Sequence, residues 1–310
     1  MQEHKITAED FERMFRFQRG ALPGFIRSAL LDINTTYHVA DAKEQEEYVL
    51  DYLKRIDQNA IPRTKQENLD AFSEGWTENY DKLLKEGISI NSLKPGYFRG
   101  SKYLRFNNRL IVSDNLQLEF DLFRIARYCI FHEYLNCYDT ICELGCGSCQ
   151  NILMLSEMYK KANIIGADWA NASKKIADYL GNHLKRNISG HIFDMLNVQG
   201  SGFFPSDSAI LTIHAFEQLG TNFSDTLSFV RKCRPGIVVQ YEPLMEFYSD
   251  NNLYDLLAIQ YCRKRNYLEN YLTALKQLEQ QQEIEIICAY RPFLGGVLHE
   301  SSLVVWRPLY

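Results

Sequence analysis

The spacing of hydrophobic positions changes about a third of the way along the chain. Before that point, charged stretches with helical spacing, residues 7–19 and 44–56, are interrupted by prolines, and no strand-like alternation persists. An apolar helical run over residues 116–135 follows, and then short β-rich runs separated by helix-length segments. That alternation is typical of a parallel sheet with crossover helices. We therefore predict a mainly helical N-terminal cap, 1–115, and an α/β domain, 116–310.

Seven β-rich runs give the expected order of the sheet. They are residues 140–144, 163–167, 191–193, 209–214, 236–241, 283–291 and 302–306. Each of the first four is followed by a segment that is able to cross over, whereas the last two lie close together. The chain thus predicts a mostly parallel sheet that ends in an antiparallel hairpin. Residues 243–282 have helical character, which indicates a helical insertion between the fifth and sixth strands.

The segment 96–109 stands apart from its surroundings because it is both aromatic and cationic. It is too polar for a core strand and too aromatic for a simple linker. We expect a loop that covers part of the molecule.

The most informative feature is a glycine-rich turn after the first predicted strand. Glu143 ends the apolar run, and Gly145, Cys146 and Gly147 follow before a predicted helix. Glycine has no Cβ and tolerates positive φ, so such a turn lets the backbone approach a ligand closely. Alone the pattern is weak, because two glycines after a strand also make an ordinary tight turn.

Acidic residues follow the next two predicted strands. Asp168 precedes Trp169 after the second run, and Asp194 precedes Met195 after the third. Together with Glu143 they recur at intervals of about one βα unit, which places all three carboxylates at the ligand-binding edge of a parallel sheet. There the second carboxylate can accept both hydroxyls of a ribose, and the third can accept the amino group of an adenine.

With these residues, the region 138–242 resembles the class I S-adenosylmethionine-dependent methyltransferases, which have a Rossmann-like sheet. The resemblance extends to segments 214–219 and 241–243, which are similar to that family's fourth and fifth strand exits. It implies S-adenosylmethionine as cofactor, with the glycine turn around its methionine part, Asp168 on the ribose, and Asp194 with Met195 at the adenine. The implied cofactor-binding residues are Glu143, Gly145, Cys146, Gly147, Asp168, Trp169, Asp194, Met195 and His214. The chain departs from the pattern at Cys149, where many members carry a third glycine.

Two other cofactor interpretations remain open. A dinucleotide-binding turn expects a third glycine where Gln150 stands, and a glutamate before the first glycine opposes a pyrophosphate. Cys142, Cys146 and Cys149 have the Cys-X3-Cys-X2-Cys spacing of radical enzymes with an iron–sulfur cluster. That interpretation places one ligand inside the predicted strand and leaves the downstream carboxylates unexplained.

Methyl transfer to a hydroxyl requires alignment of the acceptor and one base. His214 ends the fourth strand on the expected cofactor edge, and it is the first candidate for that base. The alternative is a histidine that only packs on the cofactor. His299, in the loop between the last two strands, and Glu242, at the end of the fifth, are the next candidates. Glu217 is interpreted as an early helix residue that serves either the site or the helix dipole.

Composition narrows the partners of the chain. Its 310 residues carry 34 Lys and Arg against 39 Asp and Glu, for a net charge of −5, with no long basic block. A sequence-independent nucleic-acid binder is therefore not expected. The polar N-terminus and the lack of a twenty-residue apolar window predict a cytoplasmic protein without a membrane segment. The eight cysteines are then expected as reduced thiols.

These observations predict an S-adenosylmethionine-dependent methyltransferase for a polar small molecule, with a sugar or secondary-metabolite intermediate as the suggested acceptor. A protein or peptide methyltransferase would need an open groove, which a cap of more than a hundred residues disfavours. A non-catalytic binding module would have no use for the turn and its carboxylates. No set of His, Asp and Glu has a spacing typical of a metal site, so no metal ligand is predicted. The oligomeric state stays open, with the N-terminal region as the place for a contact between copies.

Overall fold

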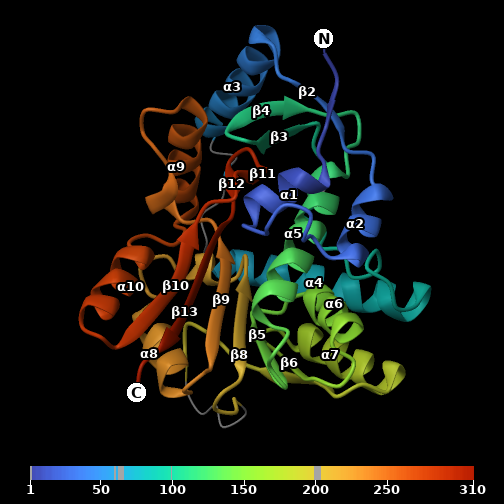
Figure 1. The fold of residues 1–310 in the computed structure, drawn as a ribbon, viewed down its shortest axis with the longest axis vertical. Helices are drawn as coiled ribbons and strands as arrows, with labels where there is room; N and C mark the ends of the chain where they lie inside the picture. Colours follow the sequence, from blue (N-terminus) through green and yellow to red (C-terminus); the bar gives the residue numbers. More distant parts are fainter. Residues whose placement is uncertain (1, 59–60, 62–65, 99, 199–203) are drawn as a thin grey trace.

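The computed structural model describes residues 2–58, 61, 66–98, 100–198 and 204–310, and for residues 66–69 the backbone alone. Its centre is a seven-stranded sheet in the order β10-β13-β9-β8-β5-β6-β7 (Figure 1). All strands are parallel except β13, which pairs antiparallel with both neighbours. The strands are β5 (Thr140–Leu144), β6 (Asn163–Asp168), β7 (Ile188–Ile192), β8 (Ala209–Ile213), β9 (Ile237–Glu242), β10 (Ile284–Tyr290) and β13 (Ser302–Pro308). The expected mixed α/β sheet with its C-terminal hairpin is confirmed.

Helices cover both faces of this sheet, so its central strands are buried on each side. One face packs against α5 (Leu118–Tyr134), α6 (Gln150–Met158) and α7 (Asn171–Leu184). The other packs against α8 (Ser224–Lys232) and α10 (Tyr271–Gln280). Alternate residues of one strand enter the two cores, as in β5, where Ile141 belongs to the first core and Cys142 to the second.

The strand β7 starts three residues before the run predicted at 191–193. Its beginning is hidden in the sequence by Ser189 and Gly190. The backbone of Lys174 in α7 passes so close that a Cβ on Gly190 would come within 2.4 Å of its carbonyl oxygen. The glycine is therefore required by helix packing, which a hydrophobic pattern does not reveal.

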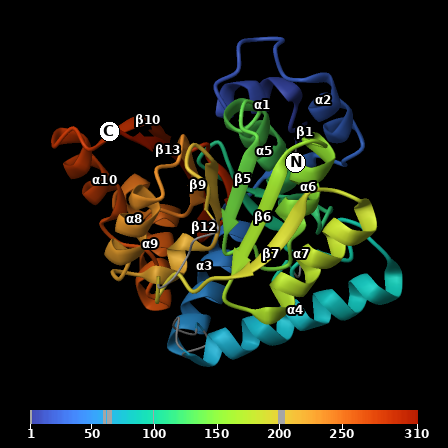
Figure 2. The same cartoon turned by 90° about the horizontal axis from the view of Figure 1, so that it is seen from below.

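The N-terminal region contains the predicted helices and also strands that the sequence did not predict. The helices are α1 (Ala8–Met14), α2 (Gly24–Leu31), α3 (Ala42–Asp57) and α4 (Gln66–Glu86), and the last runs along α7 (Figure 2). The strands β1 (His4–Lys5), β2 (Thr36–Val39), β3 (Tyr103–Phe106) and β4 (Arg109–Val112) join β11 (Leu294–Gly296) and β12 (His299–Glu300) in a second sheet. Its order is β1-β2-β4-β3-β11-β12. Strands from the N-terminal region and from residues 294–300 therefore share one sheet.

The prediction of a loop over the whole segment 96–109 was wrong, because β3 and the first residue of β4 lie in it. Residue 99 of this segment is outside the described residues. Arg105 is fully buried in β3, since its guanidinium forms ion pairs with Asp255 and Glu300. Partners distant in sequence thus make an arginine compatible with a core strand.

The insertion after β9 is helical, as expected. It comprises η2 (Met245–Phe247), α9 (Leu253–Arg265) and α10, and α9 packs against α3 through apolar contacts and a 3.0 Å hydrogen bond from the Tyr52 hydroxyl to the Leu257 carbonyl. Among the described helices, none is long and apolar enough to cross a membrane.

Candidate active site

The turn between β5 and α6 is built around two glycines that need their lack of a side chain. Gly145 has a φ of +72° and Gly147 a φ of +49°. A Cβ on Gly145 would lie 2.3 Å from the Cβ of Ala215, and one on Gly147 would lie 2.9 Å from the ring of Trp76. Cys149 occupies the left-handed position just before α6, with a φ of +59°. The turn therefore leaves room at its surface only because glycine stands at both positions.

Asp168, at the end of β6, holds this turn in place through hydrogen bonds to the backbone. Its carboxylate accepts hydrogen bonds from the backbone N–H groups of Gly147, at 2.8 Å, and Ala170, at 2.9 Å. Burial raises the pKa of Asp168 to about 6. Both carboxylate oxygens are thus engaged by the backbone, and the next residue, Trp169, is half-buried.

The residues after β7 reach the same turn. The Met195 side chain ends 3.3 Å from the place that a Cβ on Gly145 would take. Asp194 is exposed, and its carboxylate accepts a 2.8 Å hydrogen bond from the N–H of Leu196. The exits of β5, β6, β7 and β8 therefore converge at one edge of the sheet, as the sequence predicted.

A cavity of about 520 Å³ lies over the glycine turn. Its lining combines Glu143, Cys146 and the two glycines with Arg127 of α5, and Trp76, Tyr97 and Phe98 of the N-terminal region also contact it. Residues 97 and 98 belong to the segment that was expected to cover part of the molecule, and these two do so. Cys146 is 5% exposed and contributes size rather than charge.

Two side chains in this cavity each have one polar atom without a hydrogen-bond partner among the described residues. Arg127 donates through Nη1 to the side-chain oxygens of Gln150, at 2.7 Å, and Asn151, at 2.6 Å. Asn151 in turn donates to Oε1 of Glu143 at 2.5 Å. This arrangement leaves Nη2 of Arg127 and Oε2 of Glu143 buried without a hydrogen bond. Burial raises the pKa of Glu143 to about 8 and lowers that of Arg127 to about 10.

A second cavity, of about 340 Å³, adjoins the first. The two share His214, Phe98 and Phe123, so His214 lies at their junction. The second cavity is otherwise lined by apolar, aromatic and glycine residues together with His299, Ser301 and the carboxylate of Glu119. Burial raises the pKa of Glu119.

His214 has an unusual backbone. Its φ of +52° lies in the left-handed region, although it follows a buried strand. Glu242 holds this conformation, because its carboxylate accepts hydrogen bonds from the N–H groups of residues 215–217 at 3.1–3.3 Å. The His214 Nε2 atom lies 2.5 Å from the Ser301 hydroxyl. Burial and the neighbouring His299 lower the pKa of His214 to about 3.

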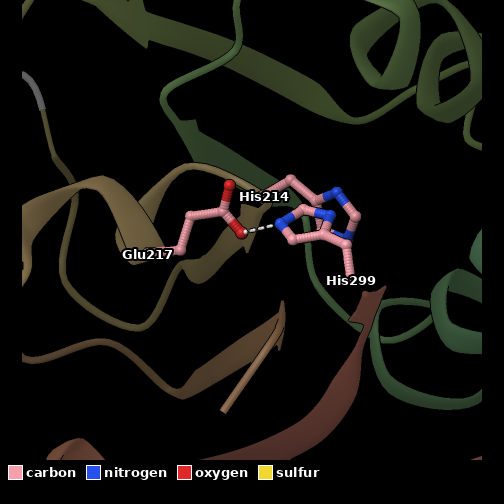
Figure 3. Close-up of side chains that lie close together, drawn as sticks. All are labelled: His214, Glu217 and His299. Carbon is pink, nitrogen blue, oxygen red and sulfur yellow. Dashed lines mark hydrogen bonds and ion pairs between the residues drawn. The ribbon is translucent and has the colours of Figure 1, made fainter. Parts of the chain in front are cut away.

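His299 comes from β12, on the opposite side of the junction. Its Nε2 atom lies 2.8 Å from Oε2 of Glu217, and its ring centroid is 4.5 Å from that of His214 (Figure 3). Gln218 holds the other oxygen of Glu217 with a 2.7 Å hydrogen bond. Burial opposes the charge of both groups, but their pairing outweighs it. The pKa of His299 is raised, and that of Glu217 is lowered.

The structure thus brings together two of the three predicted catalytic residues, His214 and His299, and places the third elsewhere. The Glu242 carboxylate accepts hydrogen bonds from the backbone just after His214. Burial and the neighbouring Glu217 raise the pKa of Glu242 to about 8. Glu217 instead takes part in the site.

Sequence reasoning missed Arg127 and Glu119. Both stand on α5, eight positions apart, and the buried residues of α5 between them are apolar. Since residues at i, i+4 and i+8 share a face, a charged pair with this spacing on an apolar face was the available signal.

The three cysteines near the turn do not meet at one point. The Sγ atoms of Cys146 and Cys149 are 3.7 Å apart, but Cys142 belongs to the core on the other face of the sheet. A cluster that needs three thiolates does not fit this arrangement.

Numbered along the chain within the large sheet, its strands run in the order 3-2-1-4-5-7-6, and only the seventh is antiparallel. This order matches the expected mostly parallel, Rossmann-like sheet with an antiparallel C-terminal hairpin. The glycine turn follows the first strand of this sheet.

No protein-family model matches the sequence, and neither does any curated protein. Solved structures are similar over about three fifths of the chain. An O-methyltransferase family 2 protein from Planctomyces limnophilus, in complex with apigenin, is 13% identical, with a TM-score of 0.45, over 63% of this chain and 60% of the other. N,N-8-amino-8-demethyl-D-riboflavin dimethyltransferase from Streptomyces davawensis is 10% identical, with a TM-score of 0.43, over 62% and 57%.

Geranyl diphosphate C-methyltransferase from Streptomyces coelicolor, in complex with Mg²⁺, geranyl diphosphate and S-adenosyl-L-homocysteine, is 9% identical, with a TM-score of 0.42, over 63% and 85%. The chain spans less than two thirds of the first two of these proteins. Their acceptors differ from one another, and at these identities they assign none to this chain.

Proposed function

We propose that this chain binds S-adenosylmethionine and transfers its methyl group to a polar small molecule. The observation that carries the proposal is the pair of unpartnered polar groups beside the glycine turn. Oε2 of Glu143 and Nη2 of Arg127 are both buried in the same cavity, and neither has a partner among the described residues. Leaving such groups unpaired costs about 1–3 kcal/mol each, so they indicate a ligand that completes them.

The amino-acid end of S-adenosylmethionine has the complementary chemistry. Its ammonium group suits the free oxygen of Glu143, and its carboxylate suits the free nitrogen of Arg127. A dinucleotide would instead bring a pyrophosphate to a turn whose preceding strand carries a buried carboxylate, and the two negative charges would repel each other. The cavity therefore favours the zwitterion.

The second cavity supports a small acceptor. It is bounded by α5 on one side and the glycines of β11 on another. The hydroxyl of Ser301, the two histidines and the carboxylate of Glu119 can hydrogen-bond a molecule with several hydroxyl or amino groups. A peptide needs a groove that is open along its length.

Each cavity has a separate task in the reaction. The bound cofactor supplies an activated methyl group. The chain aligns the acceptor at the junction of the cavities, where His214 lies, and Phe98 and Phe123 exclude water from it. The acceptor proton must leave as its oxygen or nitrogen attacks, and His214, Glu217 and His299 are the polar groups grouped at that point.

Calorimetry with S-adenosylhomocysteine and with NAD tests the cofactor. We expect the first to bind and the second to be inert. Glu143→Gln keeps the bond from Asn151 but loses the charge, and Arg127→Met removes the guanidinium, so each should weaken binding roughly 10- to 100-fold, as for a charged hydrogen bond. Arg13→Met is the matched control, because that arginine is exposed and pairs with Asp10. Unchanged affinity in folded Glu143 and Arg127 variants would contradict the proposal.

A further inference from the structure

Three side chains at the junction of the two cavities have the chemistry of a metal site. His214, Glu217 and His299 each offer one ligand atom, and these atoms all lie within 4.8 Å of one another. Figure 3 shows the Glu217 carboxylate directed to the His299 ring, and the His214 ring overlaps that ring in this view. Among the described residues, this is the one group of three or more His, Cys, Asp or Glu side chains that is close enough to hold a metal ion.

The surrounding structure holds these side chains in place. The left-handed backbone at His214 turns the chain so that residues 214 and 217 face the same point, and the buried Glu242 carboxylate secures this turn. Such strain is typical of functional sites, because a relaxed backbone would be cheaper if only packing were needed. Ser301 orients His214, and Gln218 orients Glu217, as outer-shell residues do around metal ligands.

Ordinary core packing does not explain this group. Glu217 is 2% exposed, so its carboxylate has been removed from water although a leucine or glutamine would pack at lower cost. The group carries one carboxylate and two imidazoles, and Glu119 adds a second carboxylate to the adjoining cavity. A cation bound among these side chains would compensate the negative charge of the carboxylates.

We propose that His214, Glu217 and His299 bind one divalent first-row transition-metal ion, with Zn²⁺ as the best match. Two imidazoles and one carboxylate leave a coordination position open, as in catalytic zinc sites. Imidazole ligands favour zinc, cobalt and iron over Mg²⁺, which prefers oxygen. The open position faces the second cavity, because both histidines line it.

The consequence for methyl transfer rests on the proposed function, although the binding itself does not. An acceptor hydroxyl at the open position would be more acidic, so its proton would pass to solvent or to Glu119. The oxygen electron pair would then form the new C–O bond, and the bond between the methyl carbon and the sulfonium would break with its electrons kept by sulfur. The metal would activate the acceptor and take no electron from it.

Co²⁺ is a suitable probe because its visible absorption reports its ligands. The purified 310-residue chain is dialysed against a chelator and titrated with Co²⁺ in the absence of any cofactor. We expect one Co²⁺ per chain, displaced by one Zn²⁺ and not by Mg²⁺. Glu217→Gln and His299→Asn should each weaken binding at least about 100-fold, and Ser301→Ala by about 10-fold, as for an outer-shell residue.

His38 provides a matched control, because it lies 3.0 Å from the Glu44 carboxylate and forms a second His–Glu pair in this chain. His38→Asn should leave Co²⁺ binding within twofold of the parent. Circular dichroism identifies any variant that fails to fold, and the two ligand variants provide independent tests. Absence of stoichiometric Co²⁺ binding, or equal binding by both folded ligand variants, would overturn the metal site and leave His299 and Glu217 as a hydrogen-bonded pair.

This titration and the calorimetry with S-adenosylhomocysteine together separate the two proposals. Binding of Co²⁺ with no binding of S-adenosylhomocysteine would retain the metal site and reject the proposed cofactor. Binding of S-adenosylhomocysteine by a chain that takes up no metal would do the reverse.

Discussion

The backbone N–H of Gly147 donates a 2.8 Å hydrogen bond to the carboxylate of Asp168, 21 positions later. The resemblance to methyltransferases implies that this carboxylate binds a ribose and that the glycine turn surrounds the methionine part, yet in the structure the carboxylate also supports that turn. We therefore expect Asp168→Ala to lower both cofactor affinity and the free energy of unfolding, the latter by about 1–3 kcal/mol because buried N–H groups lose their acceptor. Chemical denaturation and calorimetry measure the two effects.

Asp194→Ala is the natural comparison. That carboxylate is exposed and bonded only to a neighbouring N–H, so we expect unfolding to change by less than about 0.5 kcal/mol while cofactor affinity falls. Equal stability losses in the two variants would mean that Asp168 does not anchor the turn.

Cofactor affinity should depend on pH through Glu143. Burial raises the pKa of this carboxyl to about 8, so below pH 8 the free chain holds it protonated and must release that proton to bind an ammonium group. The affinity for S-adenosylhomocysteine should therefore rise up to about tenfold per unit between pH 6 and 8. Above pH 8 Glu143 is already charged in the free chain, so the affinity should level off.

Calorimetry between pH 6 and 9 checks this profile. Glu143→Gln has no proton to release, so the rise below pH 8 should disappear. A parent protein with a flat profile between pH 6 and 8 would be incompatible with Glu143 as the ammonium partner.

Gly145→Ala separates backbone strain from crowding. The new Cβ would lie 2.3 Å from that of Ala215, at a φ of +72°. Gly20→Ala has a similar φ of +81° but nothing within 4 Å, so it should cost only the strain of about 1–2 kcal/mol. We expect a larger loss of unfolding free energy for Gly145→Ala, together with weakened cofactor binding. Thermal and chemical unfolding of both variants would detect the difference.

The buried ion pairs of Arg105 should dominate the stability of the second sheet. Arg105→Met leaves Asp255 and Glu300 with Arg291 as their remaining guanidinium partner, which should cost about 3–5 kcal/mol. The exposed pair of Arg307 and Glu285 is the control, and Arg307→Met should cost about 0–1 kcal/mol. Urea denaturation measures both. Similar losses of unfolding free energy for the two variants would show that the buried pairs of Arg105 stabilise the protein no more than an exposed pair does.

The large sheet was predictable because its information is local. Apolar runs bounded by turn residues locate β5, β6, β8 and β9 to within a residue or so, and the glycine turn marks the first strand exit. The start of β7 was missed because Gly190 serves helix packing rather than a hydrophobic pattern.

Local sequence patterns could not predict the second sheet or the meeting of side chains at the junction of the two cavities. The strands β1 to β4 are two to four residues long, which is too short for an alternation of hydrophobic and polar residues to be recognised. Arg105 pairs with Asp255, 150 positions away, and Glu217 meets His299 across 82 positions. Such contacts depend on how separate elements pack, so the sequence supplied His214 and His299 as separate candidates without indicating that they meet.

The pairing of β3 with β11 bears on how the protein acquires activity during synthesis. All described lining residues of the first cavity lie between positions 72 and 214, so a nascent chain that has emerged past β8 already contains them. The second cavity needs residues up to Ser301 and the closure of a sheet between both ends of the chain. Because synthesis proceeds from the N-terminus, the acceptor cavity and the second histidine are completed last. A ribosome-bound intermediate is therefore expected to hold cofactor before it is able to use it.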